Sequence, residues 1–115
     1  MFVPDRHVVV AIVRAESRFN PRAVNYNCWY SIEGDLKERK TEKTDRSTSC
    51  KYGDEYLAWS VDCGLAQINR PGRKCPDYLF EPNVNMAQFV NLYLQRGFQP
   101  WDASKSKWRV ALGEG

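Results

Sequence analysis

The chain has 115 residues, 43% of them hydrophobic and 13% aromatic, which is enough material for one compact domain with a single core. Its formal net charge of +3 comes without a cluster of Lys and Arg interleaved with aromatics, so the composition argues against nucleic-acid binding and suits a polyanionic surface. No apolar run approaches the roughly 18 residues of a membrane span, so we expect no membrane insertion. The N-terminal residues also lack the pattern of a signal peptide.

The residues before Pro21 predict an amphipathic helix. It should begin near Pro4 and Asp5 and end by Asn20, because the residue before a proline is pushed out of the helical region. At roughly 100° per residue, an apolar stripe is formed by Val8, Val9, Ile12, Val13 and Phe19. The opposite face carries His7, Arg14, Ser17 and Arg18.

Glu16 falls in the middle of this stripe, although the helix has a polar face on which to place a charge. Burial without a partner disfavours the ionised carboxylate, so we expect the pKa of Glu16 to be raised and its proton to be retained near neutrality. This is the state that a general acid needs. The alternative is a buried glutamate that anchors hydrogen bonds, since structural networks also perturb carboxylates.

Regular and irregular segments alternate beyond this helix. Residues 22–30 are expected to be irregular, and residues 33–48, with five acidic and five basic side chains, predict a solvated surface insertion, either a long hairpin or a mobile loop. Residues 56–63 are rich in β-formers and predict a strand, followed at 64–69 by a short helix or a tight loop. A last helix is expected over 83–96, where a glycine then ends it.

Four cysteines stand at positions 28, 50, 63 and 75, with no CxxC pair and a single histidine in the chain. This pattern argues against a zinc site. An even count in a small domain fits two disulfides, for which three connectivities exist. We favour Cys28 with Cys50 and Cys63 with Cys75, because each pair closes a local loop. Four reduced thiols are the alternative.

Three sequence blocks follow one another in an order and spacing that can be compared with those of known families. They read Glu16-Ser17-x-Phe19-Asn20-Pro21-x-Ala23-Val24-Asn25, then Asp62-x-Gly64-Leu65-x-Gln67-Ile68-Asn69, then Leu79-Phe80-x-Pro82-x-x-Asn85. Together they resemble the lysozyme superfamily, and most closely the soluble lytic transglycosylase-like domains of phage virion proteins, endolysins and secretion-system muramidases. The resemblance spans residues 11–101. It implies one domain over 1–115, an α+β and mostly helical lysozyme-like fold with two lobes, a small β element and a central cleft.

The resemblance also assigns catalytic roles. Glu16 matches the acid that protonates the departing glycosidic oxygen, and Trp101 resembles the tryptophan that packs on that acid. Asp62 resembles the second carboxylate of the animal c-type lysozymes, whereas Asp54 is a poorer candidate for that role. If Asp62 instead caps the amides that follow it, only Glu16 remains for catalysis.

Further residues are implied to bind substrate. Gln67 and Asn69 match the motif that lines the cleft beside the scissile bond, and Tyr93 is added from the last helix. Ser17 matches the serine after the acid, which more often holds the local structure. Aromatic side chains that can stack on sugar rings are Trp29, Tyr30, Trp59 and Trp108.

The implied activity is cleavage of the β-1,4 bond between N-acetylmuramic acid and N-acetylglucosamine in peptidoglycan, without a metal or organic cofactor. The favoured chemistry is that of a lytic transglycosylase, which needs only Glu16. The alternative is a lysozyme, a glycoside hydrolase that also uses Asp62, at about 5 Å for a retaining or about 6.5–9.5 Å for an inverting mechanism. The Ala-Tyr-Asn-Ala-Gly stretch common in transglycosylases is absent.

A second alternative is a non-catalytic wall-binding or structural module of a virion. In either case the expected partner is the glycan strand of the bacterial cell wall. The chain is expected to act there as a monomer or as part of a larger phage virion or lysis protein.

Overall fold

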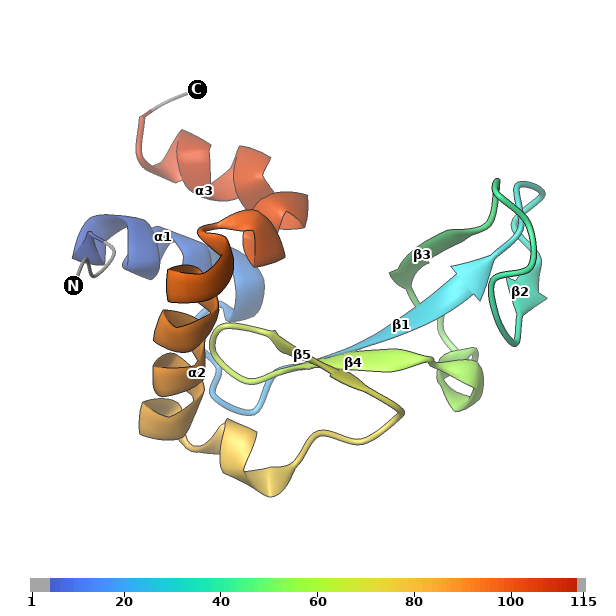
Figure 1. Cartoon of the computed structure of the whole chain (residues 1–115), viewed down its shortest axis with the longest axis horizontal. Coiled ribbons are helices and arrows are strands. Elements are labelled where there is room, and N and C mark those ends of the chain that lie inside the picture. The colour runs from blue at the N-terminus through green and yellow to red at the C-terminus, as the bar shows by residue number, and fades with distance from the viewer. Residues whose placement is uncertain (1–4, 114–115) are drawn as a thin grey trace.

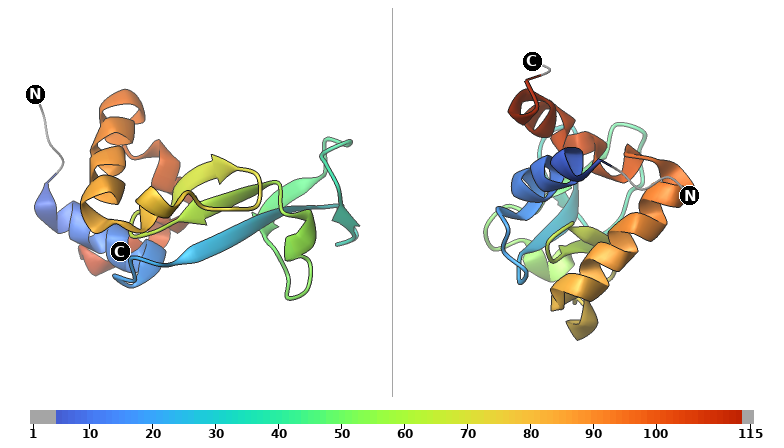
Figure 2. Two further views of the ribbon diagram at one scale, coloured as in Figure 1. Left: turned by 90° about the horizontal axis from the view of Figure 1, so that it is seen from below. Right: turned by 90° about the vertical axis from the view of Figure 1, so that its left-hand side faces the viewer.

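The structure is a computed structural model that describes residues 5–113 (Figure 1). The α-helices are α1 (Arg6–Ser17), α2 (Pro82–Arg96) and α3 (Lys105–Ala111), and the 3-10 helices are η1 (Glu55–Leu57), η2 (Asp77–Phe80) and η3 (Gln99–Ser104). The strands are β1 (Val24–Tyr30), β2 (Leu36–Lys37), β3 (Arg46–Ser49), β4 (Ser60–Cys63) and β5 (Ile68–Pro71). The three α-helices gather at one end of the molecule, and the strands extend away from them (Figure 2).

The prediction of a mostly helical, lysozyme-like fold with only a small β element is wrong. The described chain is an α+β domain in which three α-helices stand beside a five-stranded antiparallel sheet. The prediction missed much of this sheet because residues 22–30 were expected to be irregular, whereas 24–30 form its longest strand. The charged residues 33–48 contribute further to it, since β2 and β3 each pair with β1.

The sheet aligns polar residues of three neighbouring strands. In its antiparallel register Asn25 of β1 lies opposite Asp62 of β4, and Asp62 lies opposite Asn69 of β5. The next row on the same face contains Asn27 and Ser60, because residues two apart on a strand point to the same side. The strands therefore place one carboxylate among several amide and hydroxyl groups.

Helix α1 begins and ends close to the predicted points. Asp5 caps it by accepting a hydrogen bond of 2.7 Å from the backbone N–H of His7. The helix ends at Ser17 because Arg18 and Phe19 both take left-handed backbone conformations, with φ of 52° and 63°. This turn carries Phe19 out of the predicted stripe and leaves it 51% exposed.

The polar face expected for α1 is only partly solvated. Arg14 and Arg18 are exposed as predicted, but Ser17 is buried and donates a 3.1 Å hydrogen bond to the Val13 carbonyl. The angular count treated α1 as a helix with one packed side. In the fold α3 and η3 also contact it, so part of the opposite side is covered.

The main core lies where the helices meet the start of the sheet. Its fully buried members include Ile12 of α1, Val61 of β4 and Phe89 of α2, whose ring packs against Trp101 at 4.2 Å between centroids. Helix α2 confirms the helix predicted over 83–96, which is followed by Gly97 with a φ of 60°. Contrary to the prediction, it is not the last helix, because η3 and α3 follow it. None of the helices within residues 5–113 is long and apolar enough to cross a membrane.

The charged insertion is organised around a buried carboxylate. Asp45 accepts hydrogen bonds from the Lys37 ammonium at 2.8 Å and from the backbone N–H groups of Thr41 and Glu42, both at 2.9 Å. The hydrogen bond from Lys37, followed by those of the backbone, lowers the pKa of Asp45 to about 2. The segment is therefore neither a simple hairpin nor a loop without structure, because this anchor ties β2 to the turn before β3.

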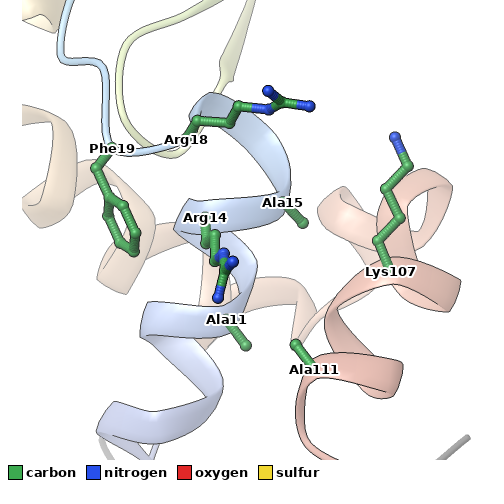
Figure 3. Close-up of a pocket in the computed structure, with 7 residues that line it drawn as sticks. All are labelled: Ala11, Arg14, Ala15, Arg18, Phe19, Lys107 and Ala111. Atoms are coloured by element: carbon green, nitrogen blue, oxygen red, sulfur yellow. The ribbon is translucent and has the colours of Figure 1, made fainter.

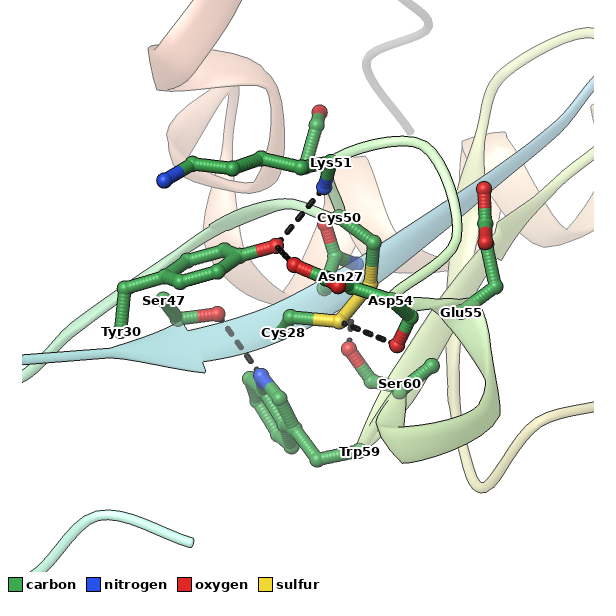
Figure 4. Close-up of a disulfide and its surroundings, with 12 residues drawn as sticks. Asn27, Cys28, Tyr30, Ser47, Cys50, Lys51, Asp54, Glu55, Trp59 and Ser60 are labelled. Carbon is green, nitrogen blue, oxygen red and sulfur yellow. Dashed lines mark hydrogen bonds between the residues drawn. A yellow bond between two sulfur atoms is a disulfide. The ribbon is translucent and has the colours of Figure 1, made fainter. Parts of the chain in front are cut away.

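The favoured disulfide pairing is confirmed. Cys28 is bonded to Cys50, and Cys63 to Cys75. The first bridge joins β1 to the residue after β3 and lies beside Tyr30, whose hydroxyl accepts from the Lys51 N–H and donates to Asp54 (Figure 4). Cys28, Tyr30 and Ala58 form a second, smaller core, against which Cys50 packs.

Removing the Cys28–Cys50 bridge should destabilise the protein substantially. The bridge closes a loop of 22 residues, and the entropy that it removes from the unfolded chain corresponds to about 3 kcal/mol. We expect the variant Cys28→Ala/Cys50→Ala to lose about that free energy of unfolding in urea titrations. The variant Cys63→Ala/Cys75→Ala serves as comparison, with a slightly smaller entropic loss for its 12-residue loop. A loss below about 1 kcal/mol would contradict the chain-entropy argument.

Candidate active site

Two adjoining cavities of about 620 and 450 Å³ lie between the helices and the sheet. Both are lined by Glu16, Asp62, Gln67 and Ala103, so they form one groove, which we name the Glu16 groove. Its two predicted carboxylates reach it from opposite sides: Glu16 from the last turn of α1 and Asp62 from the middle of β4. The groove thus joins residues that are 46 positions apart in the sequence.

The Glu16 carboxyl group is half-buried at the floor of the groove. The hydroxyl of Ser104, at the end of η3, donates a hydrogen bond of 2.5 Å to its Oε1 atom. Burial raises the pKa of Glu16 above its ordinary value of 4.5, and the negative charge of Asp62 acts in the same direction. The hydrogen bond from Ser104 and the positive charge of Lys107 act in the opposite direction but do not cancel the rise.

Asp62 is held by the amides of the sheet face. Its Oδ2 atom accepts hydrogen bonds from Asn27 at 3.1 Å and Asn25 at 3.3 Å, and its Oδ1 atom accepts from Asn69 at 2.9 Å. The open alternative was that Asp62 caps the amides that follow it. The backbone N–H of Gly64 instead donates to the Ala23 carbonyl at 2.8 Å, and the side chain of Asp62 faces the groove.

No family model matches the chain, and no curated protein and no solved structure is detectably similar to it. A function must therefore be inferred from the groove and from the three sequence blocks.

The structure brings three further predicted residues to this groove. Gln67 adopts a positive φ of 52°. Its amide donates to the carbonyls of Ala23 and Gly64, so it connects the turn after β4 to the residue that precedes β1. Asn69 lines the groove and donates to Asp62. Trp101 forms a buried wall and donates from its indole N–H to the Ala66 carbonyl at 2.8 Å.

Two predicted site residues lie elsewhere. Ser17 is buried within α1 and lines neither cavity, so its contact with Val13 is a structural one. Tyr93 packs against Phe98 at 4.8 Å between ring centroids, beside the main core. Ser17 was proposed from the resemblance, in which this serine more often holds the local structure, and its contact with Val13 agrees with that role. Tyr93 was chosen from its helix without a partner in space.

The aromatic candidates for sugar stacking separate into two groups. Trp29 and Trp59 stack on each other at 5.3 Å, and Trp59 is 39% exposed and lines the groove beside Asn69. Its indole N–H donates to Ser47 at 2.7 Å, which fixes the ring. Tyr30 and Trp108 are both buried and face no cavity.

Sequence reasoning missed Ser104, which bonds Glu16, and two of the three residues that bond Asp62, since it named only Asn69 among them. Asn25 and Asn27 alternate along β1, and this two-residue spacing would have been a usable signal if 24–30 had been predicted as a strand. Ser104 lies 88 residues from Glu16, and nothing in the sequence around it indicates the contact. Lys107, one turn into α3, also lines the groove and had no distinguishing pattern.

Proposed function

We propose that this domain hydrolyses the β-1,4 bond between N-acetylmuramic acid and N-acetylglucosamine in peptidoglycan, with Glu16 as general acid and Asp62 as the second carboxylate. One observation carries the proposal: two carboxyl groups in sharply different environments face the same groove. One is desolvated and has a raised pKa, and the other accepts three amide hydrogen bonds. Two titratable groups with separated roles are the pattern expected of glycoside hydrolysis.

Glu16 fits the role of the acid. Its raised pKa lets it keep a proton closer to neutral pH than an exposed glutamate does. In the reaction this proton passes to the glycosidic oxygen as the bond between that oxygen and C1 breaks. Ser104 holds the carboxyl group in place, so that its unbonded oxygen can face the substrate.

Asp62 fits the role of the group that stabilises the positive charge developing on the sugar ring. Its oxygens are fixed by Asn25, Asn27 and Asn69, so the charge needs little reorganisation when the transition state forms. Water then supplies the hydroxyl group that ends on C1. The remaining proton of this water returns to Glu16, which restores the starting state of both carboxyl groups. This geometry supports hydrolysis over a mechanism that uses Glu16 alone.

The nature of the substrate is supported by the lining and by the motifs. The lining of the groove includes several amide and hydroxyl side chains, and Trp59 offers an aromatic ring fixed by its hydrogen bond to Ser47, as in sites that bind sugars. The three sequence blocks that resemble the lysozyme superfamily supply Glu16, Asp62, Gln67 and Asn69, all of which lie at this groove. They point to peptidoglycan among the possible glycans.

The Asp62→Asn variant tests the two-carboxylate chemistry. We expect it to lower kcat on purified peptidoglycan by about 10²–10³-fold, because the fixed negative charge beside the scissile bond is lost. The matched control is Asp54→Asn, since Asp54 accepts its hydrogen bond from Tyr30 away from the groove. Mass spectrometry of the released muropeptides gives the second readout, with reducing ends expected from the wild-type protein.

Other outcomes would overturn parts of this proposal. Anhydro products, lighter by one water molecule, together with full activity of Asp62→Asn, would show that the reaction is a transglycosylation carried by Glu16. Purified cell walls that stay turbid and release no muropeptides would indicate a non-catalytic wall-binding or structural module.

A further inference from the structure

A third cavity, of about 750 Å³, lies between α1 and α3 (Figure 3). Its charged lining consists of Arg14, Arg18 and Lys107, and we name this cavity the basic pocket. Arg14 lies in the last turn of α1, and Arg18 directly follows the helix, where its backbone N–H donates to the Arg14 carbonyl at 3.0 Å. Lys107 reaches the same cavity from α3. The pocket thus combines cations from both ends of the sequence.

The positive charges of the basic pocket are not paired at short range within the part of the chain that the structure describes, although that of Lys107 acts on the Glu16 carboxylate and lowers its pKa. None of the three side chains forms an ion pair with a carboxylate of residues 5–113, and no acidic residue lines the pocket. Three cations around one hollow repel one another, so an anion bound there gains from all three. The charge pattern therefore predicts an anionic ligand.

The rest of the lining is apolar and small. Ala11 and Ala15 of α1 and Ala111 of α3 lie between the two helices, and the ring of Phe19 lies on the other side of Arg14 from them (Figure 3). Phe19 is there only because it and Arg18 take the left-handed conformation, which costs a phenylalanine or an arginine about 1–3 kcal/mol. A cavity lined by alanine methyl groups and by cations suits a ligand with short side chains and free carboxylates.

The basic pocket adjoins the Glu16 groove. Ala15 and Lys107 line both of them, so a ligand that occupies the groove can continue past these two residues into the pocket. Apart from Lys107, the groove on that side carries the two carboxylates Glu16 and Asp62 and neutral residues such as Asn25, so it offers no second cation. The charge of the substrate is thus met outside the place where the sugar chain is cut.

We propose that the basic pocket binds the carboxylates of the short peptide carried by the glycan, so that the preferred substrate is peptide-bearing and not naked glycan. This inference rests on the proposed function, because it assumes that the glycan lies in the Glu16 groove. The peptide of peptidoglycan hangs from the muramic acid ring and consists largely of alanine and acidic residues. The alanines of the peptide match the apolar lining of the pocket, and its carboxylates match the cations.

Binding measured with the Glu16→Gln protein tests the inference without consuming the ligand. Calorimetric titrations compare a soluble glycan strand that keeps its peptides with the same strand after the peptides have been removed by an amidase. We expect the peptide-bearing strand to bind about tenfold more tightly, as two or three exposed charge pairs allow. Arg14→Gln/Arg18→Gln should remove this difference, and added salt should reduce it.

The control variant is Arg6→Gln/Arg39→Gln, which removes the same charge from exposed positions outside the pocket and should keep the tenfold preference. Equal affinity for the two strands would overturn this inference and leave the proposed function standing. Binding of neither strand would overturn both. A soluble poly(glycerol phosphate) that competes with the peptide-bearing strand, and depends on Arg14 and Arg18, would reassign the pocket to the phosphates of the wall.

Discussion

Glu16→Gln should lower the rate of peptidoglycan cleavage by about 10²–10⁴-fold, the range for a positioned general acid. Glutamine has nearly the same shape as glutamate, and its amide oxygen can still accept the hydrogen bond from Ser104. What it cannot do is give a proton to the glycosidic oxygen. The rate is measured by the clearing of purified cell walls and by the release of reducing ends.

The control for this variant is Glu33→Gln, which makes the same chemical change at an exposed position outside the groove. It should keep wild-type activity. A Glu16→Gln protein that clears walls at the wild-type rate would show that residue 16 does not transfer the proton, and the proposed reaction would fail with it.

The same variant should be more stable than the wild-type protein at neutral pH. Because the pKa of Glu16 is raised in the folded state, the folded protein binds more protons than the unfolded chain above pH 4.5. The contribution of Glu16 to the free energy of unfolding is therefore fully present below that pH and is lost as pH rises through the folded pKa. Glutamine does not titrate, so the gain in Tm of Glu16→Gln should be close to zero in strong acid and grow above pH 4.5. A gain that shrinks as pH rises would reverse the sign and contradict the burial argument.

Local signals predicted α1, α2 and the disulfides, and the strand expected over 56–63 contains β4, but α3 and the rest of the sheet were missed. The Asp5 cap, Pro21 and Gly97 mark helix ends by chemistry that acts over a few residues, and the structure confirms α1 and α2 near those points. The sequence analysis did not predict strand β1, because two of its alternate positions carry asparagine, a residue that is depleted in strands and common in loops. Those asparagines face Asp62 in the groove, so the local rule failed where the candidate site required polar residues.

The sequence predicted those residues of the candidate site that lie in the helical stripe or in the sequence blocks. Glu16 was found from helical periodicity, whereas Asp62, Gln67 and Asn69 came from the resemblance, and all four meet at the groove. Ser104 could not be predicted, because its contact with Glu16 depends on how α3 and η3 pack against α1. Such contacts follow from tertiary packing and leave no pattern in the neighbouring sequence.

Gly64→Ala should abolish the native fold, with a destabilisation of more than about 4 kcal/mol. Gly64 has a φ of +72°, and a Cβ atom there would lie 2.3 Å from both the Asn85 amide nitrogen and the Leu79 carbonyl oxygen. Asn85 cannot move aside cheaply. It is fully buried and bonds three backbone groups, donating to the carbonyls of Cys63 and Leu79 and accepting from the Ala66 N–H, each at 2.8 Å.

Gly53→Ala separates this clash from the cost of the left-handed backbone. Gly53 has a φ of +93°, but nothing lies within 4 Å of an added Cβ atom, so that variant should lose only about 1–2 kcal/mol. Urea unfolding followed by circular dichroism measures both. Gly64→Ala/Asn85→Ala should not recover, because the Leu79 oxygen remains in the way and three buried backbone groups lose their partner. Equal losses for Gly53→Ala and Gly64→Ala would mean that the turn after β4 yields easily. In that case the contacts of Asn85 with Cys63, Ala66 and Leu79 would not fix the position of that turn.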